Sequence, residues 1–302
     1  MDAFLIILVG SLIAISCSIL GCFLILRKMA MVGDAISHAV LPGIVIAFLI
    51  SGSRDSVFMI LGASVIGIFT TFLIEFFHKK AKLQTDAAIG VTFTSLFALG
   101  IILLSVFAGQ IDLDQDCVLY GEIAYVPIDL WITKSGINMG PQALYISGFM
   151  LILNIIFVRI GFKQLYLTTF DPAFAATIGI SVTLWHYLLM GAVSMTTVAS
   201  FESVGAILVV ALLVAPPATA YLLTDNFKKM LLISCVIGVV ISITGYYLAV
   251  YLDGSIAGAV VTMAGILFGL AFFFSPHEGI VFKKIVQKRA AAKLVQQAAI
   301  KT

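Results

Sequence analysis

Two side chains that can bind a metal ion or carry a proton stand four residues apart near the start of a long apolar stretch. They are Asp34 and His38, within the segment 27–43. On a helix, residues four apart lie on one face, one above the other, so this carboxylate and this imidazole share the same surroundings. Ionisable groups inside a membrane span are costly, and by default they indicate a polar pathway or an ion site.

The depth of this pair in the span favours an ion site. At a rise of about 1.5 Å per residue, a span that begins near residue 30 places Asp34 roughly 6 Å and His38 roughly 12 Å along it. A carboxylate with an imidazole suits a borderline divalent transition metal such as Mn, Fe or Zn. One chain offers only two ligands, whereas a homodimer with this helix on its twofold axis would offer four. The alternative is a carboxylate at a helix end and a core histidine that is hydrogen-bonded to a neighbour.

Pro42 follows the pair by one helical turn. Because proline has no backbone N–H, the carbonyl of His38 loses its helical partner. We therefore predict a kink with a free oxygen beside the imidazole, and we include Pro42 among the candidate pathway residues.

The composition is that of a membrane protein. Of the 302 residues, 62% are hydrophobic and 11% are charged, whereas a soluble domain carries about 25% charged residues. A helix needs about 20 apolar residues to cross the hydrocarbon. We predict an all-α, polytopic inner-membrane helical bundle that forms a single domain over 1–302, with nine spans, or eight if the weak break at 200–203 is not real. The predicted spans are 3–26, 31–51, 57–77, 87–108, 142–160, 181–200, 204–224, 230–251 and 255–275.

The basic residues predict the orientation of these spans. With nine spans and the N-terminus outside, every lysine and arginine except Arg54 and Lys134 falls in an inner loop or in the basic tail at about 277–302. An excess of basic residues on the cytoplasmic side is the expected bias, so we place the N-terminus outside and the C-terminus in the cytoplasm. The segment 109–141 is then outside and acidic, either as a mouth that attracts cations or as an ordinary solvated loop.

The sequence lacks the common motifs of soluble and membrane enzymes. It has no Walker A pattern, so we expect that a separate subunit hydrolyses any ATP that is used. It has no HExxH, GxSxG or CxxC pattern, and its four cysteines show neither metal nor disulfide spacing. We therefore expect a transport subunit that is not an enzyme, binds no cofactor, and has membrane lipid but no nucleic acid among its partners.

A second candidate site lies in the inner segment 167–179. Asp171 is typical of an N-cap and Pro172 of a first helical residue, while Gly179 is typical of a C-terminal stop. Together they predict a two-turn helix with an apolar surface. It suits docking into a cytoplasmic partner, as the coupling helix of an ABC permease docks into its ATPase, and the alternative is a capped connector along the bilayer surface. The candidate coupling residues are Phe170, Asp171, Pro172, Ala173 and Phe174.

The run 204–220 contains the adjacent prolines Pro216 and Pro217, which free the carbonyls of Leu212 and Leu213. Such a kink survives in a membrane where neighbouring helices or a water-lined cavity satisfy the backbone. It indicates either a broken helix that lines a pathway or a packing kink among small residues.

Glu202 lies between two predicted spans, next to Ser203. It is either a carboxylate at an outer gate or a residue that marks a turn at the membrane interface. It joins Pro42, Pro216 and Pro217 as a candidate pathway or gate residue.

Four segments in chain order resemble the ABC-3 family of bacterial metal-ion permeases, which import manganese, zinc or iron(II). The resemblance runs nearly from end to end, and its most specific part is Met-Val-Gly-Asp-Ala-Ile-Ser-His-Ala-Val-Leu-Pro-Gly at 31–43. One departure is the double proline at 216–217, where many relatives have a single proline, so the local kink is expected to differ. The other three segments are 120–122, 170–175 and 204–220.

This resemblance implies the ABC importer permease fold and an assembly of two permease subunits, two cytoplasmic ATPases and an extracytoplasmic metal-binding protein. It also implies that Asp34 and His38 line the translocation path and that 170–179 couples to the ATPase. The Ser-His-Ala-Val-Leu-Pro-Gly form is more similar to manganese and iron members than to zinc members. We therefore expect a bacterial inner-membrane permease for a divalent metal ion as substrate, with Mn²⁺ first and Zn²⁺ or Fe²⁺ as alternatives.

Other functions stay open at this point. An ABC permease for a metal chelate such as a siderophore would share the partners, but it would need a wide cavity and no metal-ligating side chains. An ion-coupled secondary transporter would use Asp34 and Glu202 as proton or cation sites; repeated half-molecules would favour it, and we find no clear internal repeat. A structural or assembly membrane protein is the third alternative.

Overall fold

The structure is a computed structural model that describes residues 2–51, 56–107, 123–132 and 138–275. Within these residues, nine helical segments are long and apolar enough to cross a membrane, and α2 with α3 counts as one of them. This confirms the predicted all-α membrane bundle. The helices are α1 (Asp2–Leu26), α2 (Met31–Ala39), α3 (Leu41–Ser51), α4 (Ser56–Lys80), α5 (Thr85–Phe107), α7 (Gln142–Phe170), α8 (Pro172–Thr177), α9 (Val182–Val204), α10 (Ala206–Leu223), α11 (Phe227–Leu252) and α12 (Ile256–Phe274).

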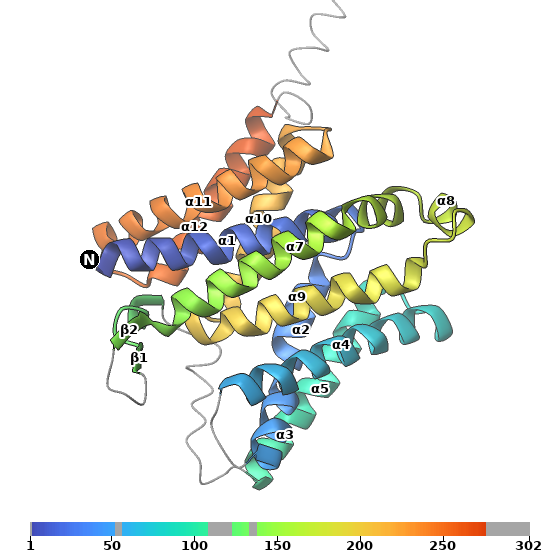
Figure 1. Ribbon diagram of the computed structural model, residues 1–302, viewed down its shortest axis with the longest axis horizontal. Coiled ribbons are helices and arrows are strands. Elements are labelled where there is room, and N and C mark those ends of the chain that lie inside the picture. The colour runs from blue at the N-terminus through green and yellow to red at the C-terminus, as the bar shows by residue number, and fades with distance from the viewer. Residues whose placement is uncertain (1, 52–55, 108–122, 133–137, 276–302) are drawn as a thin grey trace, which may run out of the picture.

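Two groups of helices are joined through α9 (Figure 1). In the first group, α1 packs against α7, α10 and α11, while α12 packs on α10 and α11. In the second group, α3, α4 and α5 pack against one another, and α2 packs on α4 and α5. Because α9 contacts helices of both groups and α2 also contacts α10, the helix that carries Asp34 and His38 lies where the two groups meet.

The first group is built around α1, which is apolar on all sides as expected for a helix surrounded by others. Val9, Cys17 and Leu20 on α1 have no exposed surface. A buried amide ties the neighbouring helices to it, because Asn154 of α7 donates hydrogen bonds to Ser16 of α1 at 2.6 Å and to Thr196 of α9 at 2.8 Å. A polar group in this apolar surrounding is costly unless it is hydrogen-bonded, so the amide favours one relative placement of the three helices.

The two adjacent prolines, Pro216 and Pro217, are buried inside α10. Pro217 leaves the carbonyl of Leu213 without its usual helical donor, and this oxygen faces Gly21 of α1, where an added Cβ would overlap it. The Cα–H groups of a glycine can approach a carbonyl closely and offer it a weak hydrogen bond. The double proline and the glycine therefore let α10 and α1 pack backbone against backbone.

We predict that Gly21→Ala destabilises the protein. The added methyl group meets the Leu213 backbone and lies 2.8 Å from Cγ of Pro217, and overpacking of this kind costs about 1–3 kcal/mol. The measurement is the melting temperature of the purified protein in detergent. The matched control is Gly148→Ala on α7, where an added Cβ meets nothing within 4 Å and the change to alanine favours the helix. Equal melting temperatures for the two variants would contradict the close α1–α10 contact.

Two helix boundaries differ from the ranges predicted from sequence. The chain breaks between α9 and α10 at Gly205, which has a φ of 79°, and not at 200–203. Only glycine adopts this backbone conformation without strain. The helix α7 runs on to Phe170, beyond the predicted end at 160, because Arg159 and Lys163 are exposed and their long stems carry the charges away from the apolar surface.

A short hairpin precedes α7, and no strand was predicted there. It pairs β1 (Leu130–Ile132) with β2 (Asn138–Pro141) in antiparallel fashion. The 3-10 turn η1 (Ile123–Tyr125) lies before the hairpin. The resemblance segment at 120–122, much of the acidic segment and the basic tail at about 277–302 lie outside the described residues.

Candidate functional site

Asp34 and His38 form an ion pair within α2. The distance between Oδ1 of Asp34 and Nε2 of His38 is 3.6 Å, and their side chains are 35% and 38% exposed respectively in the single chain. At this length the contact is not a hydrogen bond, and it is an ion pair only while the imidazole is protonated. Lone pairs on the carboxylate and on a neutral imidazole therefore remain for a ligand on this face.

The kink predicted at Pro42 is present as a break between α2 and α3. Only Val40 separates the two helices, and its carbonyl accepts hydrogen bonds from the N–H groups of Gly43 at 2.9 Å and Ile44 at 3.2 Å. The helix α5 is packed against this break, because an added Cβ at Gly100 would lie 2.8 Å from Cδ of Pro42. The break and the ion pair are therefore held one turn apart by the same neighbour.

One wall of the site is aromatic and comes from α5. The ring of His38 lies 5.8 Å from the ring of Phe93 and 6.2 Å from the ring of Phe97. These rings limit the space on one side of the imidazole. Sequence reasoning missed both residues, although their spacing of four on an apolar helix places them on one face.

The opposite face of α2 is closed by packing. Gly33 sits against α10, where an added Cβ would overlap the side chain of Leu213. The hydroxyl of Ser37 donates to the Gly33 carbonyl at 2.9 Å, so it is turned to its own helix. The ion pair therefore lies on the open face of a helix whose other face is tightly packed.

The single chain offers few ligands for a metal ion. Among the residues whose placement the structure gives, no group of three or more His, Cys, Asp or Glu side chains could hold a metal. A transition-metal site normally has four or more ligands. Asp34 and His38 therefore supply part of a coordination shell.

The predicted short helix in 167–179 is α8, and its capping is as expected. The Asp171 carboxylate accepts a hydrogen bond from the N–H of Phe174 at 2.9 Å, and Pro172 is the first helical residue. Phe170 and Phe174 are each 51% exposed, and Ala173 is exposed as well. Figure 1 shows α8 at the tip of the bundle, at the end away from the N-terminus and the hairpin. Its apolar side chains are thus presented at one end of the molecule.

The remaining candidate residues lie on α9 and α10. Glu202 belongs to the last turn of α9, and the placement of its side chain is not described. Pro216 and Pro217 are buried at the contact of α10 with α1. Leu213, one turn before them, is the residue that contacts Gly33 beside Asp34, so the proline helix packs directly on the helix that carries the ion pair.

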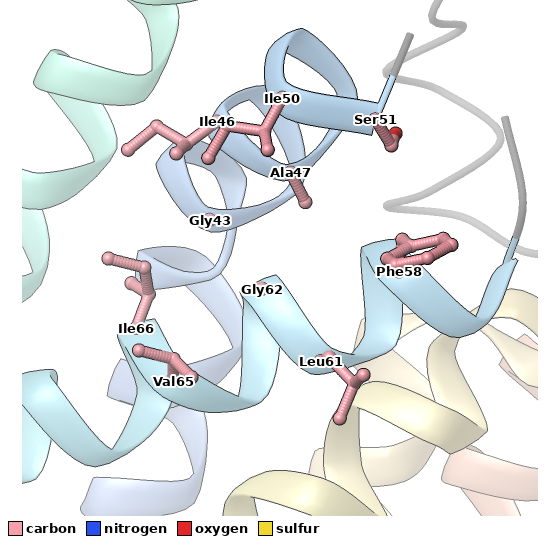
Figure 2. A pocket seen from close by; sticks show the side chains of 10 residues that line it. All are labelled: Gly43, Ile46, Ala47, Ile50, Ser51, Phe58, Leu61, Gly62, Val65 and Ile66. Atoms are coloured by element: carbon pink, nitrogen blue, oxygen red, sulfur yellow. The ribbon is translucent and has the colours of Figure 1, made fainter. Parts of the chain in front are cut away.

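A pocket of about 590 Å³ lies between α3 and α4, but its chemistry does not suit an ion. Figure 2 shows that its lining is aliphatic and aromatic, with Ser51 as the one polar side chain among the residues that line it. Asp34 and His38 do not line this pocket.

Comparison with known proteins identifies the family. The family model of the ABC 3 transport family matches residues 3–275. This chain belongs to that family. It is a multi-pass membrane permease of the ABC type, and membership decides against the ion-coupled secondary transporter.

The chain is similar over more than nine tenths of its length to members with a named substrate. It is 48% identical over 280 residues to the manganese transport system membrane protein MntD of Bacillus subtilis, covering 93% of this chain and 94% of that one. It is 42% identical over 289 residues to the zinc transport system membrane protein TroD of Treponema pallidum, covering 94% of this chain and 77% of that one. Among solved structures, PsaBC from Streptococcus pneumoniae in complex with Fab has a TM-score of 0.74 at 32% identity, covering 91% of this chain and 92% of that one.

We predict that Gly100→Ala impairs both stability and transport. An added Cβ would lie 2.9 Å from the Pro42 nitrogen, so α5 must move away from the break and carry Phe97 away from His38. The expected cost is about 1–3 kcal/mol of stability, with transport by the assembled ABC transporter reduced beyond any loss of assembled protein. Gly90→Ala on the same helix is the control, because its Cβ meets nothing within 4 Å. Equal transport by both variants would contradict a role of this contact in the site.

Proposed function

We propose that this chain is the permease subunit of an ABC importer that moves a divalent transition metal ion, Mn²⁺ in first place, into the cytoplasm. The observation that carries the proposal is the Asp34–His38 pair, at 3.6 Å and about one third exposed, inside a membrane span. A carboxylate and an imidazole suit this class of ion. The manganese transport protein MntD, similar over more than nine tenths of both chains, supports the choice of metal.

The exposure of the pair supports the presence of a second permease subunit. Charged side chains at membrane depth face a bundle interior or a water-filled cavity and do not face lipid, yet the Asp34–His38 face of α2 is open in the single chain. We infer that a second copy covers this face, so that two carboxylates and two imidazoles meet around the ion. Four ligands on two movable subunits bind the ion and release it when the subunits separate, as conduction requires.

The break at Val40 gives this site a means of movement. Because α2 and α3 are separate helices, α2 can tilt with the ion pair while α3 keeps its packing against α4. The Phe93 and Phe97 rings then act as a fixed wall against which His38 moves. Pro42 belongs to this hinge, and we assign Pro216 and Pro217 to the packed support on its other side.

We place the ATPase and the binding protein at opposite ends of the bundle. We place the N-terminus outside and the C-terminus in the cytoplasm of a bacterial inner membrane, from the distribution of lysine and arginine. The exposed side chains of α8 are then cytoplasmic, and they dock into an ATPase that supplies the energy. An extracytoplasmic binding protein delivers the ion at the opposite end, near the hairpin.

The pair should be essential for uptake. We expect that Asp34→Ala and His38→Ala each lower metal uptake at least about tenfold, since even weakening the support of a metal ligand costs 10–100-fold, while assembly of the complex survives. The measurement is elemental analysis of cells that lack their own importers and express the whole system in medium containing Mn²⁺, Fe²⁺ and Zn²⁺.

The controls are Asp86→Ala and His78→Ala, which remove exposed residues of the same types on α5 and α4. Both should accumulate the same metal as the wild type. The metal that accumulates only with an intact pair is the substrate. Normal uptake by either Asp34→Ala or His38→Ala would overturn the proposal, and uptake of a siderophore instead of free ions would favour a chelate permease.

The α8 surface should determine ATPase binding. We expect Phe174→Ala to lower the affinity for the ATPase by about 2 kcal/mol, as the loss of an exposed aromatic anchor does, because its side chain is 51% exposed while Ala175 beside it is buried. Co-purification of the ATPase with the tagged permease measures this. Tyr251→Ala is the control, since Tyr251 is 86% exposed near the end of α11. Unchanged co-purification for Phe174→Ala would show that α8 is only a connector.

A further inference from the structure

The C-terminal end of α1 is fixed by a capping motif that the sequence did not reveal. Lys28 has a left-handed backbone with φ 58°, its N–H bonds to the carbonyl of Ile25, and the N–H of Met29 bonds to the carbonyl of Leu24. This is a Schellman motif, in which Arg27 is the C-cap residue directly after α1. The motif places the Arg27 side chain at a defined position, four residues before α2 begins at Met31.

The Arg27 guanidinium contacts three side chains on the two helices that flank α8, namely α7 and α9. Its Nε donates to Oγ1 of Thr169 at 3.0 Å and a terminal nitrogen donates to Oγ1 of Thr168 at 2.9 Å, both in the last turn of α7. Its other terminal nitrogen lies 3.5 Å from Nδ1 of His186, in the second turn of α9. We call these four residues the Arg27 clasp.

The hydroxyl oxygens of Thr168 and Thr169 are free to accept hydrogen bonds from Arg27, because their protons point to the backbone of α7. Thr168 donates its own hydroxyl proton to the Gln164 carbonyl at 2.8 Å, and Thr169 donates to the Leu165 carbonyl at 2.6 Å. With the protons committed to the helix backbone, the lone pairs are left for the guanidinium. The planar fork of arginine suits such a paired set of acceptors, and lysine does not.

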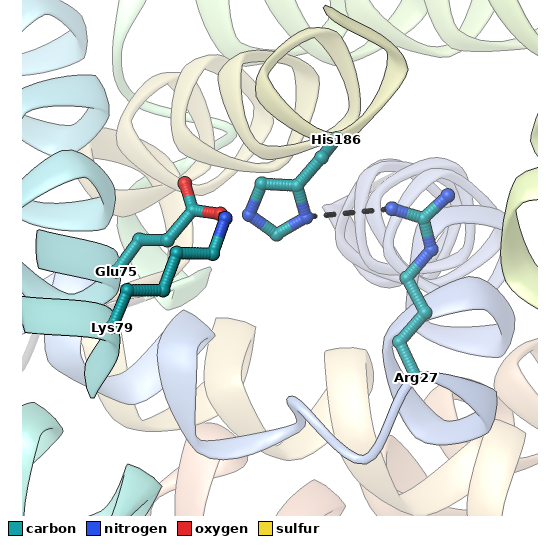
Figure 3. A network of polar contacts seen from close by, with 4 residues as sticks. All are labelled: Arg27, Glu75, Lys79 and His186. Carbon is teal, nitrogen blue, oxygen red and sulfur yellow. Dashed lines mark hydrogen bonds and ion pairs between the residues drawn. The ribbon is translucent and has the colours of Figure 1, made fainter. Parts of the chain in front are cut away.

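Two more charged residues lie beyond the imidazole of His186. Figure 3 shows His186 between Arg27 and the pair of Glu75 and Lys79, both on α4. Nε2 of His186 is buried and has no hydrogen-bond partner, and the Glu75 carboxylate pairs directly with the ammonium of Lys79. Burial lowers the pKa of Arg27 to about 10, and the guanidinium stays protonated at neutral pH.

We propose that Arg27 is a positioning residue that transmits the movement of α8 to the helix carrying Asp34 and His38. The clasp joins the end of α7 and the start of α9, which flank α8, to the end of α1. The linker from α1 to α2 is short and is held by backbone hydrogen bonds. Met29 is bonded back to Leu24, and its carbonyl accepts from the N–H of Val32 at 3.1 Å. A displacement of Thr168 and Thr169 therefore moves α2 by a similar amount. The inference rests on the proposed function of α8.

The test compares ions transported with ATP consumed. The permease, with its ATPase and binding protein, is reconstituted in liposomes as wild type, Arg27→Gln and Arg27→Lys, and Mn²⁺ uptake and phosphate release are measured together. We expect Arg27→Gln to keep hydrolysing ATP while ions per ATP fall about tenfold, within the usual range of coupling between sites. Arg27→Lys keeps the charge but not the planar fork. It should transport fewer ions per ATP than the wild type and more than Arg27→Gln.

The matched control is Arg159→Gln on α7, an exposed arginine outside the clasp, which should keep the wild-type ratio. If Arg27→Gln does not assemble, the double variant Thr168→Val and Thr169→Val removes the acceptors with the same shape, and the same loss of ions per ATP is expected. A wild-type ratio in Arg27→Gln, or in the double valine variant, would overturn the inference. Absence of Mn²⁺, Fe²⁺ and Zn²⁺ uptake by the wild type itself would instead overturn the proposed function.

Discussion

The cost of holding a carboxylate and an imidazole at membrane depth is the constraint on which the rest of the structure depends. The chain does not bury this pair: Asp34 and His38 keep about a third of their surface exposed, while the other face of α2 is sealed at Gly33 against Leu213. In lipid such a face has to be covered by other polar groups, so the single chain leaves the proposed ion site incomplete. In the proposed importer this would be an advantage, because a coordination shell completed within one rigid chain would hold the ion too firmly to release it.

Close backbone contacts explain how the rest of the bundle stays rigid around that open face. In a membrane, helices gain little from hydrophobic burial and associate through close packing of small residues. Gly21 lets α1 meet the carbonyl of Leu213, Gly100 lets α5 meet Pro42, and an added Cβ at Gly43 would lie 2.6 Å from the carbonyl of Gly62 on α4. Each contact fixes a neighbour of α2 or α3 in place.

The sequence predicted the elements better than the contacts between them. Hydropathy, the N-cap Asp171 and the proline at 42 are local signals, and the spans, α8 and the break at Val40 follow from them. The break at Gly205 was misplaced, because Ser200 to Ser203 look polar while their helix continues as far as Val204. The aromatic wall of the site and the Arg27 clasp join residues far apart along the chain, and no local pattern in one sequence encodes such contacts. Arg27 looked like an ordinary basic residue at the inner end of a span.

In the proposed importer two routes lead from α8 to the ion pair, and they resist different movements. The first is packing, since α9 follows α8 and contacts α2 directly. Packed apolar surfaces in a bilayer resist being pushed together, but they separate at small cost because lipid tails replace the lost contacts. The second is the Arg27 clasp, whose charged hydrogen bonds lie in a partly buried, low-dielectric region and resist being pulled apart. The proposed cycle must both open and close the site; in it, packing supplies the push and the Arg27 clasp contributes to the pull.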